Sequence, residues 1–284
     1  MRMFERSFEK ILFTAALLSA SITLLIFIFM LVLGLPLFRE GLFWDLLSDP
    51  WMPQQGLYGI YPMIISTMSI AFLGFLFAFP LSIGVAIFIN GLAPGRIGSY
   101  VNTAVRLMTG IPTVVYGFVG IFLLIPLMRT ILQGGSGMCV LSAALILAVV
   151  IAPTMILFFI SSFKSVPNAY LRSATALGAT PIQKLLYIVV PSSWNGILTG
   201  CVLALGRAMG DTMIALMLAG NAVAAPDGIA SAARALTAHI ALVIAADVNS
   251  MAFKSIFACG IVLYVLTAFF TAVLRLTTSR RAAS

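Results

Sequence analysis

The stretch MCVLSAALILAVVIAPTMILFFISSF, residues 138–163, decides the fold class. Its 26 residues include no Asp, Glu, Lys, Arg or His. At about 1.5 Å per residue, a helix of this length exceeds the roughly 30 Å hydrocarbon thickness of a bilayer. We therefore predict a membrane-spanning helix here, and the rest of the chain has the same character.

The composition of the whole chain agrees with a membrane protein. Of its 284 residues, 62% are hydrophobic and only 8% are charged, whereas soluble globular domains contain about 25% charged residues. The charges fall between long apolar runs, which leaves no room for an appended catalytic domain. The net charge of +8 comes from basic residues at the ends of apolar segments, where they set topology, so we exclude nucleic acid binding.

Six apolar runs predict six transmembrane helices and an all-α integral membrane fold. The first run is too long for a signal peptide, so we expect a retained helix. Pro62 and Pro80 are expected to bend the second run rather than end it. The predicted spans cover residues 11–37, 61–90, 111–127, 138–163, 195–218 and 251–276.

The distribution of Lys and Arg predicts that both termini are cytoplasmic. With the N-terminus inside, 11 of the 16 basic residues fall in inner segments and 4 in outer segments. This is the excess expected of cytoplasmic loops. The remaining basic residue, Arg207, falls inside the fifth span.

Charge within the fifth span is the sharpest functional signal. The stretch GRAMGDT, residues 206–212, places Arg207 and Asp211 four positions apart, which predicts a common helical face. A charge at the centre of a span costs roughly 2.5–3.5 kcal/mol. Either the two charges neutralise each other and hold helices together, or they line a polar pathway. In the second case the guanidinium fork binds a tetrahedral oxyanion and Asp211 positions it or tunes its field.

Small and hydroxylated residues are weaker candidates for the same pathway. Gly206 and Gly210 allow either close helix packing or space for a substrate. Thr67 in the second span and Thr113 in the third could supply hydroxyls, as could Thr212 beside Asp211. Hydroxyls in membrane helices more often bond their own backbone, however, so packing remains the alternative.

Motifs for metal, disulfide or nucleotide chemistry do not occur in the sequence. Cys139, Cys201 and Cys259 lie within or beside apolar runs without CxxC spacing. The single histidine, His239, falls in the last predicted outer loop, where we expect a solvated side chain or a docking contact. Because a GxxxxGK[ST] loop is missing, we expect no cofactor in this chain, and any energy source must be a partner.

Two segments outside the spans carry further information. The outer segment, residues 38–59, contains Trp44, Trp51 and Tyr58, which suit the membrane interface, although a plain connector is the alternative. The inner segment, residues 165–191, is amphipathic and is interrupted at Gly178 and Pro181. It predicts two short helices at an angle, which either pack on the bundle or present a knob to a soluble partner.

The inner segment resembles the coupling motif of ABC importer permeases, written EAA, three residues, G, nine residues, IxLP. The spacing matches throughout, and the coupling residues are then Arg172, Ser173, Ala174, Gly178, Ile188 and Pro191. Arg172 stands where the family usually has glutamate, and Ser173 stands where it has alanine. These departures concern the acidic contact to the ATPase rather than the presence of coupling helices.

Three further stretches resemble the phosphate-specific (Pst) permeases, and in particular their PstC-like subunit. They are YGIYP at 58–62, leading to Ser66 and Thr67, IPTVVYG at 111–117, and GRAMGDTM at 206–213. By this resemblance Arg207 and Asp211 take part in phosphate translocation. Asp211 stands where the family more often has glutamate.

The resemblance implies a MetI-like ABC importer permease core over residues 58–284, after a helix and an outer interfacial segment over 1–57. It implies ATP-driven phosphate import across the bacterial cytoplasmic (inner) membrane. The expected partners are a PstA-like second permease, two cytoplasmic ATPase subunits, a periplasmic or extracellular phosphate-binding protein and the lipid bilayer, with ATP and magnesium on the ATPase subunits. Import of sulfate, molybdate or tungstate remains open, as does an ion-coupled secondary transporter that uses Asp211 as a proton relay.

Overall fold

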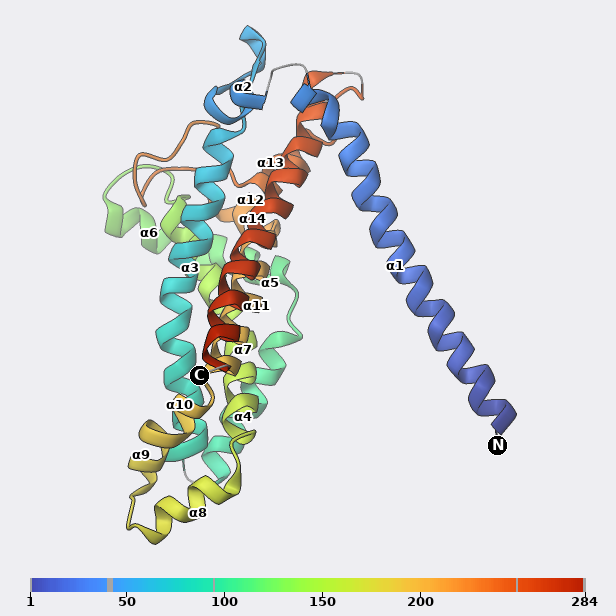
Figure 1. Cartoon of the computed structure of the whole chain (residues 1–284). Helices are drawn as coiled ribbons and strands as arrows, with labels where there is room; N and C mark the ends of the chain where they lie inside the picture. The colour runs from blue at the N-terminus through green and yellow to red at the C-terminus, as the bar shows by residue number, and fades with distance from the viewer. Residues whose placement is uncertain (1, 40–42, 94, 249, 283–284) are drawn as a thin grey trace.

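A computed structural model of the chain describes residues 2–39, 43–93, 95–248 and 250–282 (Figure 1). In this part, five helical runs are long and apolar enough to span a membrane, and a sixth is added if the bent pair Pro181–Ser192 and Trp194–Gly210 is one span. The predicted all-α membrane fold is thereby confirmed. The helices are α1 (Arg2–Arg39), α2 (Phe43–Ser48), α3 (Tyr61–Ile87), α4 (Gly95–Thr109), α5 (Thr113–Val119), α6 (Ile125–Leu132), α7 (Val140–Lys164), α8 (Asn168–Ala176), α9 (Pro181–Lys184), α10 (Val190–Ser192), α11 (Trp194–Gly210), α12 (Met213–Leu218), α13 (Leu236–Val243) and α14 (Met251–Ala282).

The core is built around α7, which packs between α3 and α11. Small residues let these helices approach closely. A Cβ at Gly74 of α3 would lie 3.2 Å from the carbonyl oxygen of Ala144, and one at Gly200 of α11 would lie 2.9 Å from the ring of Phe159. Phe159 itself is fully buried. The stretch that decides the fold class therefore also forms the centre of the bundle.

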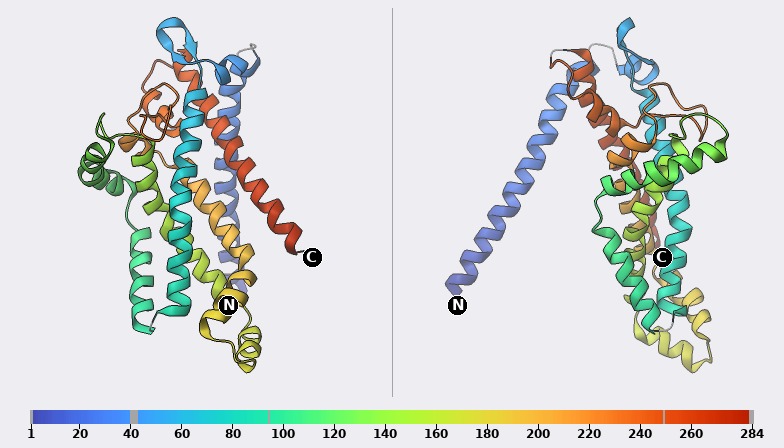
Figure 2. Two further views of the ribbon diagram at one scale, coloured as in Figure 1. Left: turned by 90° about the vertical axis from the view of Figure 1, so that its left-hand side faces the viewer. Right: turned by 180° about the vertical axis from the view of Figure 1, so that it is seen from behind.

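The first and last long helices, α1 and α14, pack together near one end and then diverge (Figures 1 and 2). Glycines form this contact, with Gly34 of α1 close to Ile261, and Gly260 of α14 close to Met30. Most described side chains of α1 are exposed, as for a helix that faces lipid or a partner. The described ends of both helices point toward the end of the bundle that carries α8 and α9.

The region of the third predicted span differs from the prediction. Residues 95–109, which lie between the second and third predicted spans, form α4, because Val101, Val105 and Met108 recur on one helical face and turn toward α7. The apolar run then comprises α5, a π-helical turn (Gly120–Leu124) and α6. This run lies crosswise to α3 rather than alongside it (Figure 2). Tyr116 links α5 to α4, since its hydroxyl donates to the carbonyl oxygen of Met108 at 3.0 Å.

The outer segment forms α2 and a short antiparallel hairpin of β1 (Trp51–Met52) and β2 (Leu57–Tyr58), joined by a 3₁₀ turn (Pro53–Gln55). Trp51 is buried, and its ring lies 5.6 Å from that of Tyr58 and 4.3 Å from the imidazole of His239. The prediction of a solvated His239 was wrong. Residues 236–243 form α13, which packs on α14, so the hairpin and the bundle enclose the imidazole completely.

Candidate functional site

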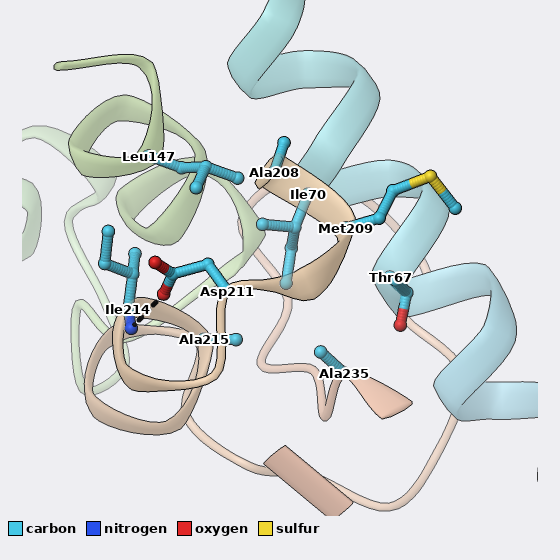
Figure 3. Close-up of a pocket in the computed structure, with 9 residues that line it drawn as sticks. All are labelled: Thr67, Ile70, Leu147, Ala208, Met209, Asp211, Ile214, Ala215 and Ala235. Atoms are coloured by element: carbon cyan, nitrogen blue, oxygen red, sulfur yellow. Dashed lines mark hydrogen bonds between the residues drawn. The ribbon is translucent and has the colours of Figure 1, made fainter. Parts of the chain in front are cut away.

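The fifth predicted span is interrupted at the charged motif. Helix α11 ends at Gly210, Asp211 is extended with φ −73° and ψ 120°, and α12 begins at Met213. The Asp211 carboxylate accepts a hydrogen bond from the amide of Ile214 at 2.9 Å (Figure 3). Aspartate at such a position caps a new helix and competes with helix continuation. The prediction that Arg207 and Asp211 share one helical face was therefore wrong.

Arg207 lies on the exposed face of α11. Its Nη1 donates to the hydroxyl of Thr154 on α7 at 3.3 Å. No ion pair within the described ranges joins Arg207 to Asp211, although the two interact electrostatically. The positive charge is thus positioned by a neutral oxygen and remains available to an anion.

The glycines of α11 divide into two kinds. Gly196 approaches the side chain of Ser162, and Gly200 approaches Phe159, so both are needed for packing on α7. At Gly206 and Gly210, by contrast, a Cβ would point into open space, with no heavy atom of another described segment within 4 Å. Gly206 precedes the exposed Arg207 and Gly210 follows it by three positions, so the helix surface near the arginine is open.

Hydrogen bonds that involve Thr67 and Thr237 hold the start of α13. The Thr67 hydroxyl accepts from the amide of Leu236 at 2.8 Å and donates to the carbonyl oxygen of Met63 at 2.8 Å. Thr237 in turn donates to the carbonyl oxygen of Asp211 at 3.0 Å. The start of α13 is therefore fastened both to α3 and to the break between α11 and α12.

A cavity of about 10 Å³ lies at this junction. Figure 3 shows Thr67 and Asp211 on its wall, with the Asp211 carboxylate turned toward Ile214 and away from Thr67. This volume accommodates about one water molecule and is too small for a tetrahedral oxyanion. Arg207, by contrast, lies on an open face of α11. The cavity is lined by Thr67, Ile70, Leu147, Ala208, Met209, Asp211, Ile214, Ala215 and Ala235.

The other two threonines lie where α5 approaches α12. Thr113 begins α5, Thr212 precedes α12, and both side chains are half-buried. Close packing joins the two helices, since a Cβ at Gly117 would lie 2.7 Å from the sulfur of Met217. Within the described residues neither threonine hydroxyl makes a hydrogen bond.

The segment expected to couple to an ATPase forms two short helices, as predicted. Gly178 adopts φ +80° between α8 and α9, a conformation that favours glycine. Thr180 and Gln183 form a reciprocal capping box at the start of α9. Lys184 donates to the hydroxyl of Thr175 at 3.1 Å, which fixes α9 against α8. The turn is therefore a defined corner rather than a loose loop.

The residues of the coupling motif divide between the corner's surface and its packed side. Arg172 and Ser173 are exposed, Pro191 is also exposed, and Ile188 is half-buried. Ala174 is buried, whereas Leu177 at the corner is 88% exposed. Tyr170 on α8 and Ile182 on α9 are exposed apolar side chains as well. Several such side chains together are typical of an interaction surface.

Two residues of the candidate site, Thr154 and Thr237, were not predicted from the sequence. Thr154 is a hydroxyl inside a long apolar helix, directly after Pro153, and this isolated polarity was the available signal. Thr237 lacked such a signal, because its role depends on α13 folding back onto the break at Asp211. Both residues act through contacts between segments distant in sequence.

Comparison with known proteins identifies the class. Residues 80–282 match the family of binding-protein-dependent transport system inner membrane components. The probable ABC transporter permease protein YqgH of Bacillus subtilis is 31% identical over 239 residues, which covers 83% of this chain and 77% of that protein. The phosphate transport system permease protein PstC of Mesorhizobium japonicum is 31% identical over 249 residues, covering 81% and 76%.

Solved transporters share the fold. A chain of a bacterial alginate ABC transporter, crystallised with an alginate pentasaccharide-bound periplasmic protein, has a TM-score of 0.66 at 19% identity and covers 99% of this chain and 98% of its own. A chain of the MetNI methionine ABC transporter has a TM-score of 0.61 at 18% identity, covering 82% and 98%. The chain therefore belongs to the family of binding-protein-dependent transport system inner membrane components, as an ABC importer permease similar to the PstC phosphate permeases.

Proposed function

We propose that this permease carries inorganic phosphate inward. The observation that supports the proposal most directly is Arg207, which lies on an exposed helix face beside open space and pairs with a neutral hydroxyl instead of a carboxylate. A guanidinium held in this way presents several donors to a tetrahedral oxyanion. The similarity to PstC permeases, at about 30% identity over most of the chain, supports phosphate as the oxyanion.

The proposed assembly contains a PstA-like second permease, two cytoplasmic ATPase subunits and an external phosphate-binding protein. The ATPase contact is proposed at the corner between α8 and α9, where Leu177 is exposed. This assignment makes the α8–α9 end of the bundle cytoplasmic. Both described chain ends point in that direction, in agreement with the excess of Lys and Arg in the inner segments (Figure 1).

The chain offers a direct mechanical path from this corner to Arg207. Helix α9 continues through a π-helical turn (Leu185–Val189) and α10 into a 65° bend before α11. Ser193 anchors the bend, since its hydroxyl donates to the carbonyl oxygen of Ser162 on α7 at 3.1 Å. Arg207 follows 14 residues later, about 21 Å along the helix. Movement of the corner by closing ATPases would tilt α11 against α7 and displace the arginine from Thr154.

Release of phosphate follows from the weakness of a single arginine site. Binding must be strong enough to admit the anion yet weak enough to let it leave. One guanidinium held by the neutral hydroxyl of Thr154 meets this requirement better than a closed cage. Moving the guanidinium away from Thr154 as the transporter opens inward would lower the affinity of this site for phosphate.

A permease for sulfate, molybdate or tungstate is the second candidate, because one arginine does not set the size of its ligand. The test is uptake of labelled phosphate by cells with and without this gene, in the presence of excess unlabelled phosphate, sulfate or tungstate. We expect deletion to remove phosphate uptake, and only phosphate to compete in the wild type. Unchanged phosphate uptake with a deficit in another oxyanion would replace the cargo and retain the importer mechanism.

A further inference from the structure

A second arginine lies in the segment between α12 and α13. Arg234 is half-buried, and its Nε donates to the carbonyl oxygen of Asn221 at 3.1 Å. Asn221 adopts φ +55° just beyond α12, and its side-chain amide donates to the carbonyl oxygen of Leu216 at 2.6 Å. The arginine is thus held by a backbone corner that is itself fixed to the end of a helix.

The charge of Arg234 is not neutralised by its described surroundings. No carboxylate in the described ranges pairs with it, and the titratable side chain with which it interacts is His239. Burial and the nearby arginine lower the pKa of His239 to about 4, so the imidazole is uncharged at neutral pH. Burial lowers the pKa of Arg234 as well, yet a guanidinium remains charged at physiological pH.

Other basic side chains toward this end of the bundle do not share this environment. Arg129 and Lys254 are exposed, so water solvates their charges. Arg129 also donates from Nε to a backbone carbonyl, that of Ser136, at 2.6 Å. The backbone bond is therefore common to both arginines, and partial burial without a counter-charge distinguishes Arg234. Leaving a partly buried charge without a counter-ion is unfavourable, and an anionic ligand would relieve it.

Arg234 lies past the charged motif of residues 206–212, on the side away from α8 and α9. Ala235 lines the same small cavity as Asp211, and Thr237 donates to the Asp211 carbonyl oxygen. Asp211 caps the first turn of α12, whereas Asn221 follows its end. The six residues of α12 separate these two points by about 9 Å. An anion that enters from this end would therefore approach Arg234 before Arg207.

We propose that Arg234 forms an outer oxyanion subsite, which receives the anion after delivery and passes it to Arg207. This inference rests on the proposed function, because it requires an oxyanion as cargo. Two arginines in series, each bound to one neutral oxygen, would hold the anion in stages without trapping it.

The test compares Arg234→Gln, Arg234→Lys and Arg129→Gln in the assembled transporter in liposomes. Phosphate-loaded binding protein is added outside, and labelled phosphate import and ATP hydrolysis are measured together. Glutamine can still donate to the Asn221 carbonyl oxygen but lacks the charge, whereas lysine keeps the charge. We expect Arg234→Gln to lower the phosphate imported per ATP hydrolysed roughly tenfold, the effect of losing one hydrogen bond to a charged group.

We expect Arg234→Lys to restore most of this ratio, and Arg129→Gln to leave it unchanged. A wild-type ratio in Arg234→Gln would overturn the subsite. Equal losses of import, ATP hydrolysis and assembled protein in both Arg234 variants would also overturn it, because the arginine would then only hold the loop. If the wild type imports sulfate or molybdate instead of phosphate, the same comparison made with that anion decides for or against the subsite. Import of no oxyanion at all would remove the proposed function and the subsite together.

Discussion

Arg207 on α11 and Thr154 on α7 are joined by a hydrogen bond of 3.3 Å from Nη1 to the threonine hydroxyl. The bond connects the helix that follows the coupling corner to the central helix of the bundle. Because a hydroxyl carries no charge, it positions the guanidinium without cancelling its field. The pair thus combines a site for an anion with a contact that changes when the two helices move.

Replacing Arg207 by glutamine is expected to abolish uptake while membrane insertion and assembly with the partners persist. The charge that attracts the anion is lost, whereas an exposed side chain contributes little to the bundle's packing. Uptake of labelled phosphate and co-purification of the partner subunits measure the two effects. Normal uptake by Arg207→Gln would exclude this arginine from the mechanism.

Thr154→Val provides the matched variant for the opposite end of the same bond. It removes the acceptor at nearly constant volume and leaves the charge of Arg207 in place. We expect uptake to fall by less than in Arg207→Gln, because the arginine keeps its charge but loses its position. Abolished uptake in both variants would indicate that the contact between α7 and α11 matters as much as the charge.

Two variants of Asp211 separate its role as the cap of α12 from a role in tuning the field of Arg207. Asp211→Asn preserves an oxygen that accepts from the Ile214 amide, whereas Asp211→Ala removes the cap and is expected to cost about 1 kcal/mol of stability. We expect the asparagine variant to retain the wild-type melting temperature in detergent and to lose transport, if the carboxylate tunes the Arg207 field. Wild-type transport by Asp211→Asn would restrict this residue to capping α12.

Thr67 and Ser66 are adjacent buried hydroxyls on α3 with different contacts. Ser66 donates to the carbonyl oxygen of Pro62 in its own helix, at 2.6 Å, whereas Thr67 also accepts from the amide of Leu236. Thr67→Val leaves that buried amide without an acceptor, which costs about 1–3 kcal/mol. We expect its melting temperature to fall well below that of Ser66→Ala. Equal effects would show that the contact to α13 contributes little.

Substitutions of Gly178 test the corner between the coupling helices α8 and α9. A Cβ there would meet no described atom within 4 Å, so a substitution acts through the backbone conformation at φ +80°. A β-branched residue is disfavoured at such φ, whereas asparagine tolerates it. We expect Gly178→Val to reduce co-purification of the ATPase and Gly178→Asn to retain most of it. Unchanged ATPase binding by both Gly178→Val and the bulkier Gly178→Arg would exclude this corner as the docking element.

The lowered pKa of His239 predicts how the free energy of unfolding depends on pH. Its folded-state pKa of about 4 lies below the ordinary 6.5, so between these values the unfolded chain binds a proton that the folded chain excludes. The free energy of unfolding should therefore fall as the pH is lowered from 6.5 toward 4. We expect the drop in melting temperature between about pH 7 and about pH 5 to be smaller in His239→Phe than in wild type. The same drop in both would place the responsible proton elsewhere.

Long apolar runs made most of the spans predictable, because a backbone in hydrocarbon must satisfy its hydrogen bonds within a helix. The corner at Gly178 was equally readable, since glycine and Pro181 end helices by local geometry. Helix α4 was missed because only one of its faces is apolar. The hydroxyl partner of Arg207 was missed because Thr154 lies 53 positions away in the chain.

The sequence by itself determined the membrane class, the charged motif in the fifth span and the coupling element. These depend on composition and on spacing within one segment. Only the tertiary structure decided that Asp211 caps α12 instead of facing Arg207, that His239 is buried under Trp51, and that Arg234 lies without a counter-charge among the described residues. Each of these outcomes depends on which distant backbone groups and side chains meet, and a local period of about 3.6 residues contains no information about such encounters.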